Sequence, residues 1–340
     1  MRDYYRPLLS TDPVRPPDAL TLAGGWAWFN SVHVMSRTST PRVMPATDLC
    51  DQIRCALTSE RAPVGGTTLD QPRVLGILNV TPDSFSDGGD HVVASGALRR
   101  SGQMWDDGVN WIDIGAESTR PGAQTVPVNE ELARLAPYFD SGESLGAFSI
   151  DTRKAVVAQS ALGAGAVMVN DVSAMAFDPD MTGVMANSEA AVCLVHAQGD
   201  PETMQQNPTY EDVLFDVYDS LAVRVAYAEA AGITRDRIVL DPGIGFGKTL
   251  EHNLTLLQDI ALFHSLGCAL MVGASRKGFV GKLSGVDNPK DRVAGSLAVA
   301  LAMAAQGVQI HRVHDVAETV QGFRMLTAIW GHATDDSEDT

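Results

Sequence analysis

Eight short apolar runs, each followed by a longer amphipathic segment, constrain the fold of this 340-residue chain more than any other feature. The runs are continuous rather than alternating, which is typical of strands buried on both faces of a parallel sheet. They are Val74–Asn79, Trp111–Ile114, Ala147–Ile150, Val167–Asn170, Ala191–His196, Arg237–Leu240, Ala269–Gly273 and Gln309–Val313. Eight strand–helix units in about 255 residues predict an α/β fold of the (β/α)₈ TIM barrel type. A doubly wound open sheet is the alternative, which the strand count and even spacing disfavour.

Helix-like segments lie between the runs, and residues 1–70 do not share this rhythm. The predicted helices are Asn129–Tyr138, Lys154–Gly163, Glu211–Ala231, His252–Leu266, Asp291–Ala305 and Val316–Met325. The N-terminal extension, residues 1–70, holds a proline-rich stretch, an aromatic patch at 26–29, a helix-like Thr47–Leu57 and the linker Gly65-Gly66-Thr67-Thr68. We expect it to pack on the barrel, residues 71–330, or on a second subunit, without chemistry of its own. We expect the acidic C-terminal tail, residues 331–340, to be frayed.

Composition narrows the class of partner to small molecules. The formal net charge of −17 at pH 7 argues against nucleic acid or an anionic membrane, but a local basic pocket for a phosphorylated small molecule is compatible with it. No apolar run approaches the roughly 18 residues of a membrane span, and the N-terminus lacks the apolar core of a secretory signal. The four cysteines show neither CxxC spacing nor a disulfide pattern. These features predict a cytoplasmic protein.

Polar or ionisable residues stand at the carboxyl end of every predicted strand, although the strands themselves are apolar. They are Asn79, Asp113, Asp151, Asn170, His196, Asp241, Ser275 and the pair Arg312 and His314. A single residue of this kind would usually cap a helix or end a strand. Because (β/α)₈ barrels place their active sites at this rim, the whole set predicts a ligand site.

Asp151, Asn170 and Asp241 follow nearby strands and predict a pocket for a flat heterocycle rich in N–H donors. Two carboxylates and an amide supply the acceptors that such donors need when they are buried. The alternative for Asp151 is a cap on the helix that begins near Thr152, and both roles are compatible.

Arg312 and His314 lie on either side of Val313, beside Asn79 on the neighbouring first strand. Arginine binds phosphate oxygens bidentately, and asparagine offers an oxygen that Mg²⁺ accepts alongside water and phosphate oxygens. This group predicts an anion and Mg²⁺ site. The alternative for His314 is a strand-end histidine bonded to Asp315.

Two further motifs follow strands. Asp241–Thr249 is rich in glycine, but it fails the GxxxxGK[ST] template of a P-loop because Gly243 lies too close to Lys248. We expect its glycines to let the backbone bend beside a ligand, with Phe246 as a wall. Ser275-Arg276-Lys277-Gly278 opens a helix whose backbone N–H groups can hold a carboxylate or phosphate, and a solvated basic cap is the alternative for its arginine.

The first strand opens into a long polar loop that contains Asp83, Phe85 and Asp87. A hairpin turn would need far fewer residues. Long polar loops after buried strands are where α/β folds place ligand contacts, so this loop is predicted to contact the ligand.

Together these segments closely resemble dihydropteroate synthase, a pterin-binding family of the folate pathway. The matching motifs are Gly76–Gly89, Asp113–Ala123, Ser149–Lys154, Val169–Ser173, His196–Gln205, Asp241–Asn253, Gly273–Gly281 and Arg312–Thr319. The resemblance implies a (β/α)₈ barrel that is usually a homodimer. It also implies condensation of 6-hydroxymethyl-7,8-dihydropterin diphosphate with p-aminobenzoate, with release of pyrophosphate.

The resemblance also implies roles for individual residues. The pterin ring would be bound by Asp151, Asn170, Asp241 and Lys277. The diphosphate would be held by Asn79, Arg312, His314 and Thr119, with Mg²⁺ near Asn79. The p-aminobenzoate site would be bordered by Thr119, Arg120, Pro121, Phe246, Lys277, Ser275 and Phe85. The catalytic roles would fall to Asp87, which faces developing positive charge, and to Lys277, Asp151, Arg312 and His314.

The chain departs from the family pattern at three positions. Val195 and Ala197 stand where relatives often have methionine, and Gly278 stands where some have serine. The loop Thr119-Arg120-Pro121 has no insertion, so we expect sensitivity to sulfonamides. One alternative is a pterin-binding methyltransferase barrel, which needs neither a diphosphate clamp nor an arylamine loop. The other is a non-catalytic homologue that only binds pterin, against which the filled motif positions argue.

Overall fold

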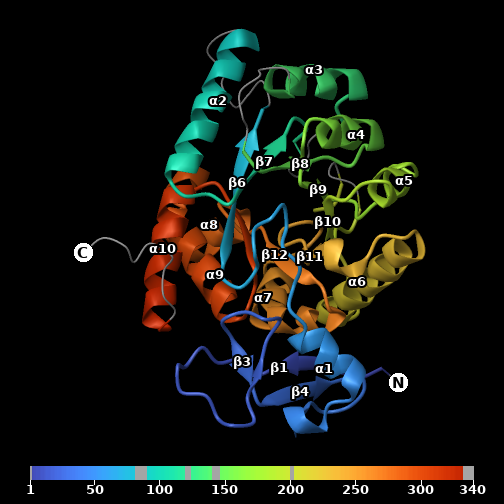
Figure 1. The fold of residues 1–340 in the computed structure, drawn as a ribbon, viewed down its shortest axis with the longest axis vertical. Coiled ribbons are helices and arrows are strands. Elements are labelled where there is room, and N and C mark those ends of the chain that lie inside the picture. The colour runs from blue at the N-terminus through green and yellow to red at the C-terminus, as the bar shows by residue number, and fades with distance from the viewer. Residues whose placement is uncertain (1, 81–89, 119–123, 140–145, 200–202, 332–340) are drawn as a thin grey trace.

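The computed structural model describes residues 2–80, 90–118, 124–139, 146–199 and 203–331. Parallel strands close into a barrel in the order β6-β7-β8-β9-β10-β11-β12-β13, and β13 pairs back onto β6 (Figure 1). Their bounds are β6 Arg73–Asn79, β7 Trp111–Gly115, β8 Phe148–Asp151, β9 Met168–Asp171, β10 Ala191–Val195, β11 Ile238–Asp241, β12 Ala269–Val272 and β13 Ile310–Val313. The prediction of a TIM barrel is confirmed, and the closed pairing excludes the open sheet.

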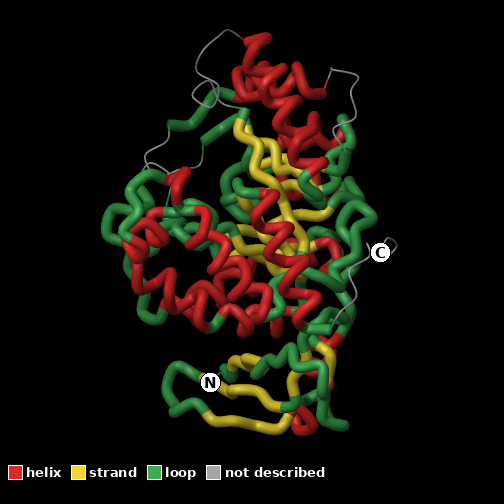
Figure 2. Tube along the Cα trace, turned by 90° about the vertical axis from the view of Figure 1, so that its left-hand side faces the viewer, coloured by secondary structure: helices red, strands yellow, loops and turns green. Residues whose placement is uncertain are grey.

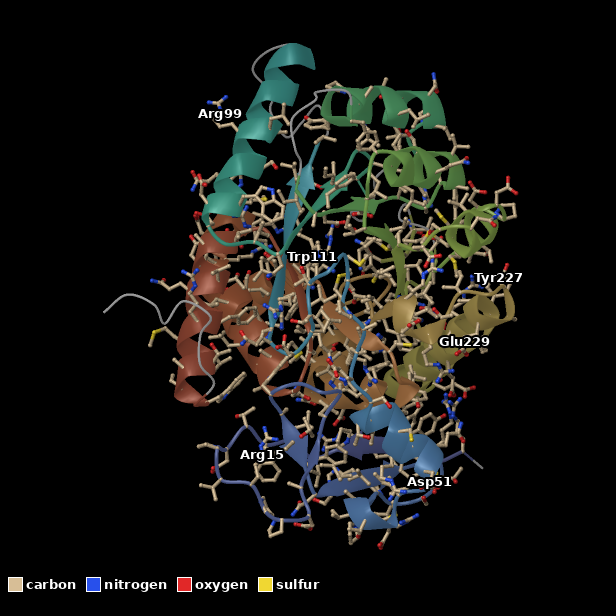
Figure 3. The ribbon with its side chains drawn as sticks, viewed as in Figure 1. Arg15, Asp51, Arg99, Trp111, Tyr227 and Glu229 are labelled. Carbon is tan, nitrogen blue, oxygen red and sulfur yellow. The ribbon has the colours of Figure 1, made fainter. Side chains whose placement is uncertain are left out.

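The interior of the barrel is a packed core, because its strands are buried on both faces. Every residue of β7 to β12 is buried. Trp111 lies in the middle of the molecule (Figure 3) and donates its indole N–H to the carbonyl oxygen of Val64 at 3.1 Å. The interior cluster includes Leu69, Leu75, Trp111, Met168, Cys193, Val239, Met271 and Ile310. Only the ends of such a barrel are available to a ligand.

Helices surround the strands (Figures 1 and 2). Their bounds are α2 Asp90–Asp106, α3 Val128–Phe139, α4 Ala155–Gly163, α5 Met181–Ala186, α6 Val213–Ala230, α7 Leu250–Gln258, α8 Gly278–Ser284, α9 Val293–Ala305 and α10 Val316–Ile329. Local sequence sets two of their starts. Asp212 accepts the backbone N–H groups of Leu214 and Phe215 at α6, and Thr249 forms a capping box with His252 at α7. No helix in the described ranges is long and apolar enough to cross a membrane.

The N-terminal extension covers the end of the barrel opposite the carboxyl ends of the strands (Figures 1 and 2). It consists of an antiparallel sheet of β1 Tyr4–Pro7, β4 Ser31–Met35 and β5 Arg42–Pro45, a ribbon of β2 Leu20–Thr21 and β3 Trp28–Phe29, the 3-10 helix η1 Ala46–Asp48 and helix α1 Asp51–Thr58. Tyr4 stacks on Phe215 with ring centroids 4.2 Å apart. Trp26 stacks on Trp330, and its indole N–H donates to the carbonyl oxygen of Ala304 at 2.9 Å. The extension therefore packs on the helices of the barrel, and its sheet went unpredicted.

The segment that joins the extension to the barrel forms part of the base. Val64 and Thr67 exchange backbone hydrogen bonds of 3.0 Å around Gly65-Gly66, whose φ angles are 54° and 83°. A Cβ atom at the first of these glycines would lie 2.7 Å from the side chain of Val167, so a larger residue does not fit. Gly65, Gly66 and Thr68 are exposed and connect the extension to the barrel, which agrees with the interpretation of a linker, whereas Val64 and Leu69 on either side of them belong to the interior cluster with Trp111.

The prediction of one helix over His252–Leu266 is wrong. Helix α7 ends at Gln258, and Ile260–Leu266 form a 3-10 helix, η4, in which every residue is buried. η4 contacts β1 and α1 of the extension as well as β12. Because it has no solvent-exposed face, the amphipathic pattern that identifies a surface helix does not apply to it.

Candidate active site

A pocket lies among the strand ends at the carboxyl rim of the barrel. It is lined by Asp151, Asn170, Val172, Val195, Asp241, Phe246, Gly273, Lys277 and Arg312. The polar residues in this set were predicted as ligand contacts from separate strands, and the structure brings them together. A wider hollow of about 970 Å³ lies under α1 at the opposite end, where barrels of this type do not place catalytic groups.

Arg312 bridges two carboxylates at the floor of the pocket. Its Nε donates to Asp113 Oδ2 at 2.6 Å, and a terminal nitrogen donates to Asp151 Oδ2 at 2.8 Å. The start of α4 is capped differently, because Asp178 accepts the backbone N–H of Ala155 at 2.8 Å. The helix-cap alternative for Asp151 is therefore wrong, and its carboxylate belongs to the pocket.

Asn170 is buried beside the pocket with part of its hydrogen-bonding capacity unused. Its Nδ2 donates to Asp113 Oδ2 at 3.1 Å, whereas Asn170 Oδ1 and Asp113 Oδ1 have no partner among the described residues. A buried acceptor without a donor costs roughly 1–3 kcal/mol. An N–H donor of a ligand would satisfy it, which agrees with the prediction of a donor-rich heterocycle.

Burial shifts the pKa of three charged groups that line the pocket. It raises the pKa of Asp151 to about 7, although Arg312 opposes this shift. It also raises the pKa of Asp241, against the opposing charge of Lys277. Burial lowers the pKa of Lys277 to about 8, again opposed by Asp241. Because these charges are poorly solvated, a polar ligand that pairs with them gains more than it would at the surface.

The loop after β11 orients Asp241. The backbone N–H of Gly243 donates to Asp241 Oδ1 at 2.7 Å. Gly243 has a φ of 70°, and a Cβ atom there would lie 1.8 Å from the carbonyl oxygen of His196, so glycine is required. Asp241 Oδ2 lies 3.8 Å from the point that a Cβ at Gly273 would occupy. The glycine thus leaves open space beside this carboxylate.

Two lysines near this loop have different surroundings. Lys277 donates to the carbonyl oxygen of Ile244, and its Nζ lies 4.2 Å from the ring centroid of Phe246, in the geometry of a cation–π contact. Lys248 is buried, and its Nζ lies 2.9 Å from Nδ1 of His196. Because Lys248 does not line the pocket, the structure agrees with the rejection of a P-loop.

His314 and Ser275 meet where β12 and β13 end. His314 Nδ1 lies 3.1 Å from Ser275 Oγ, and the backbone N–H of His314 donates to the same oxygen at 3.2 Å. The carboxylate of Asp315 pairs instead with the guanidinium of Arg276. The alternatives in which Asp315 bonds to His314 and Arg276 is a solvated cap are therefore wrong.

Two side-chain oxygens lie beside Gly115 at the end of β7. A Cβ atom at Gly115 would lie 3.6 Å from Asp151 Oδ2 and 3.8 Å from Asn79 Oδ1. Glycine therefore leaves a space between a carboxylate and an amide oxygen. In the described part of the chain no three His, Cys, Asp or Glu side chains cluster as metal ligands. This donor set fits Mg²⁺, which keeps water and takes phosphate oxygens from a substrate.

Five predicted site residues lie outside the described residues. They are Phe85, Asp87, Thr119, Arg120 and Pro121. Glu117, which precedes Thr119 by two residues, belongs to a buried ion-pair network that was not predicted from the sequence. Lys154 pairs with both Glu117 and Glu131, and Arg153 pairs with Glu117 at 3.1 Å. The sequence shows that charged residues stand next to these strand ends, but it does not show which of them pair.

Asp113 is a second feature whose role was missed. Its side chain is fully buried and accepts hydrogen bonds from both Arg312 and Asn170. It follows Trp111 by two residues in β7, and alternate residues of a strand share a face. Because Trp111 belongs to the interior cluster, this spacing places Asp113 on the inner face as well.

A (β/α)₈ barrel with these acceptors around one rim pocket defines an enzyme that binds a flat, polar small molecule. A model of the family described as pterin binding enzyme matches residues 75–314. The chain is 44% identical over 267 residues to the dihydropteroate synthase of Escherichia coli K12, a match that covers 77% of this chain and 94% of that protein. The chain belongs to the dihydropteroate synthase family, whose members are transferases of folate biosynthesis.

Solved structures agree with this assignment. The dihydropteroate synthase of Yersinia pestis in complex with a sulfonamide drug superposes with a TM-score of 0.74 at 42% identity, covering 80% of this chain and 99% of that chain. The Xanthomonas albilineans enzyme in complex with 7,8-dihydropteroate superposes with a TM-score of 0.72 at 38% identity, covering 80% of this chain and 100% of that chain.

Proposed function

We propose that the rim pocket joins 6-hydroxymethyl-7,8-dihydropterin diphosphate to p-aminobenzoate, giving 7,8-dihydropteroate and pyrophosphate. The buried acceptors Asp151, Asn170 and Asp241 carry this proposal, because Asn170 Oδ1 lacks a donor. The edge of a pterin ring presents several N–H donors to such a set. Lys277 supplies a donor for a ring acceptor, and Val195 gives the ring an apolar wall.

The diphosphate is proposed to lie against His314, Ser275 and Asn79 at the adjoining strand ends. Arg312 contributes its guanidinium from the pocket side, where the diphosphate competes with Asp151 for the same donors. Asn79 would hold Mg²⁺, which would supply positive charge to offset the charge of the leaving pyrophosphate. The residues of this group bind and orient the leaving group.

The proposed chemistry needs electrostatic stabilisation rather than a protein nucleophile. The bond from the pterin methylene carbon to the diphosphate oxygen breaks, the arylamine nitrogen bonds to that carbon, and the amine loses a proton. Asp151 and Asp241 lie where positive charge develops on the ring, and preorganised charges of this kind stabilise a transition state. Phe246, packed against Lys277, borders the p-aminobenzoate site. That site is completed, in this proposal, by Phe85, Asp87, Thr119, Arg120 and Pro121.

A second copy of the chain is proposed to cover the face formed by α9 and α10. These helices pack together, and the exposed side of α9 consists of Ala294, Ala298, Ala302 and Ala305. On α10, Met325 and Ile329 are 60% and 71% exposed. Exposed apolar residues on two helices that pack together support a homodimer interface here. Ala298→Glu should halve the mass measured by light scattering, and an unchanged mass contradicts this interface.

The decisive experiment is release of pyrophosphate by the purified chain when both substrates and Mg²⁺ are supplied. Release that depends on p-aminobenzoate supports the proposal. Pterin binding without release supports the non-catalytic alternative. Methyl transfer from methyl-tetrahydrofolate without pyrophosphate release supports the methyltransferase alternative.

We propose that the enzyme acts in the cytoplasm.

A further inference from the structure

Lys248 is a buried amine to which the proposed reaction assigns no task. It lies between β11 and α7, and only 3% of it is exposed. Its polar partners are uncharged: Nζ lies 2.9 Å from His196 Nδ1, 2.9 Å from the carbonyl oxygen of Gly243 and 3.0 Å from that of Phe246. Burial lowers the pKa of Lys248 well below its ordinary value, although Asp241 opposes the shift. A buried amine is costly unless hydrogen bonds satisfy it, so its presence calls for a physical reason.

The loop that Lys248 occupies approaches the end of β10 unusually closely. A Cβ atom at Gly243 would lie 1.8 Å from the carbonyl oxygen of His196, and one at Gly247 would lie 2.4 Å from that of Gln198. Lys248 Nζ also lies 3.3 Å from the carbonyl oxygen of His196. The lysine therefore bridges carbonyl groups of two chain segments that would otherwise repel each other.

The bridged turn carries contacts to two groups of the pterin pocket. At its start, the backbone N–H of Gly243 donates to Asp241 Oδ1 at 2.7 Å. At its other end, the ring of Phe246 lies 4.2 Å from Lys277 Nζ. In this proposal Lys248 does not contact the substrate. Its Nζ donates to the carbonyl oxygens of both Gly243 and Phe246. A displaced turn would therefore shift a pterin acceptor and a pterin donor together.

His196 completes this arrangement as a neutral acceptor. Burial and the charge of Lys248 lower the pKa of His196 well below its ordinary value. The ring therefore stays neutral near pH 7, and with its proton on Nε2 it offers the Nδ1 lone pair to Lys248. A protonated His196 would carry a proton on Nδ1 and could no longer accept this hydrogen bond.

We propose that Lys248 and His196 form a positioning pair that holds residues 243–246 against the end of β10 and thereby sets the geometry of Asp241 and Lys277. The inference rests on the proposed roles of Asp241 and Lys277 in pterin binding. Neither Lys248 nor His196 touches the reacting atoms. Their effect is expected in substrate affinity rather than in the chemical step.

Lys248→Met tests the pair, because methionine keeps an unbranched side chain without the amine. We expect the Kd for a pterin without diphosphate and the KM for p-aminobenzoate each to rise about tenfold, the effect of one lost hydrogen bond to a charged group. The kcat at saturating substrates should stay within about threefold, because the leaving-group residues are unchanged. His196→Leu should match Lys248→Met. His196→Asn, whose amide oxygen can replace Nδ1 as acceptor, should restore both constants.

Thermal unfolding separates this role from a merely structural one. A lower melting temperature of Lys248→Met with unchanged Kd and KM would overturn the inference, and so would a collapse of kcat at unchanged KM. If Lys248→Met does not fold, the matched His196 variants decide, and equal constants for the leucine and asparagine forms overturn it. The proposed function fails by a different result, the absence of pyrophosphate release by the unmodified chain, while the pterin Kd series still tests the pair.

Discussion

Replacing Asp241 with alanine isolates the contribution of one buried carboxylate to pterin recognition. Asp241 is 4% exposed, and its Oδ2 borders the open space at Gly273. Without it, the pterin N–H groups assigned to this carboxylate would be buried with no acceptor. At roughly 1–3 kcal/mol for each of two donors, the loss in binding free energy is about 2–6 kcal/mol, or roughly thirtyfold to 10⁴-fold in Kd.

The hydrogen bond from the Gly243 N–H to Asp241 affects stability rather than affinity. Asp241→Ala removes this bond from the free and the bound protein alike, so its loss lowers the free energy of unfolding by about 1–3 kcal/mol and leaves the affinity unchanged. Because burial raises the pKa of Asp241, keeping it ionised at neutral pH already destabilises the folded chain. Replacing the Asp241 carboxylate removes this destabilisation and offsets part of the lost hydrogen bond, so the variant should remain folded.

Calorimetric titration with a pterin that lacks the diphosphate measures this effect directly. Asp236→Ala is the matched control, because it removes one exposed carboxylate from η3, Arg235–Arg237, at the opposite end of the barrel. We expect the control to bind like the unmodified chain. A folded Asp241→Ala protein whose Kd lies within about threefold of the control would refute the acceptor role.

Four further outcomes are expected. Pterin affinity should rise as pH increases through about 7, where Asp151 becomes an ionised acceptor, and fall above about 8, where Lys277 loses its proton. Asp151→Asn should remove the acidic limb of this profile, and Lys277→Arg should remove the basic limb. A flat profile in the unmodified chain contradicts both assignments. Asp87→Ala should spare pterin binding but slow turnover, and unchanged turnover would remove Asp87 from the mechanism. A sulfonamide should compete with p-aminobenzoate; turnover unaffected by saturating sulfonamide at low p-aminobenzoate would refute this. Trp26→Ala should lower the free energy of unfolding by about 3–5 kcal/mol without changing pterin Kd, and a loss below about 1 kcal/mol in denaturant titration would mean that the extension is weakly packed.

The barrel was predictable because its signal is local. A strand buried on both faces needs a continuous apolar run, and each predicted run lies within one residue of the observed strand. The rim was predictable for the same reason, since a polar residue directly after such a run must stand at a strand end. The places of Asp151, Asn170 and Asp241 at strand ends therefore follow from local sequence.

Elements without a repeating pattern were not predictable. The sheet and the ribbon of the extension have strands of two to five residues. Helices of the barrel more than 200 residues away bury these strands, as the contact of Tyr4 with Phe215 shows. Helix η4 was misjudged because the extension removes its solvent face. In both cases the environment of the segment, rather than its own composition, determines its structure.

Local sequence patterns are sufficient to predict the barrel, the rim and the kinds of side chain that stand there. Which of these side chains pair depends on how the chain folds. Arg312 and Asp113 are separated by 199 residues, yet Arg312 Nε lies 2.6 Å from Asp113 Oδ2. Lys248 and His196 are separated by 52 residues, yet Lys248 Nζ lies 2.9 Å from His196 Nδ1. Closing the barrel brings the strand ends together in a space with little water, where the energy of a charge depends on its partners. No feature of the chain near either residue specifies that partner.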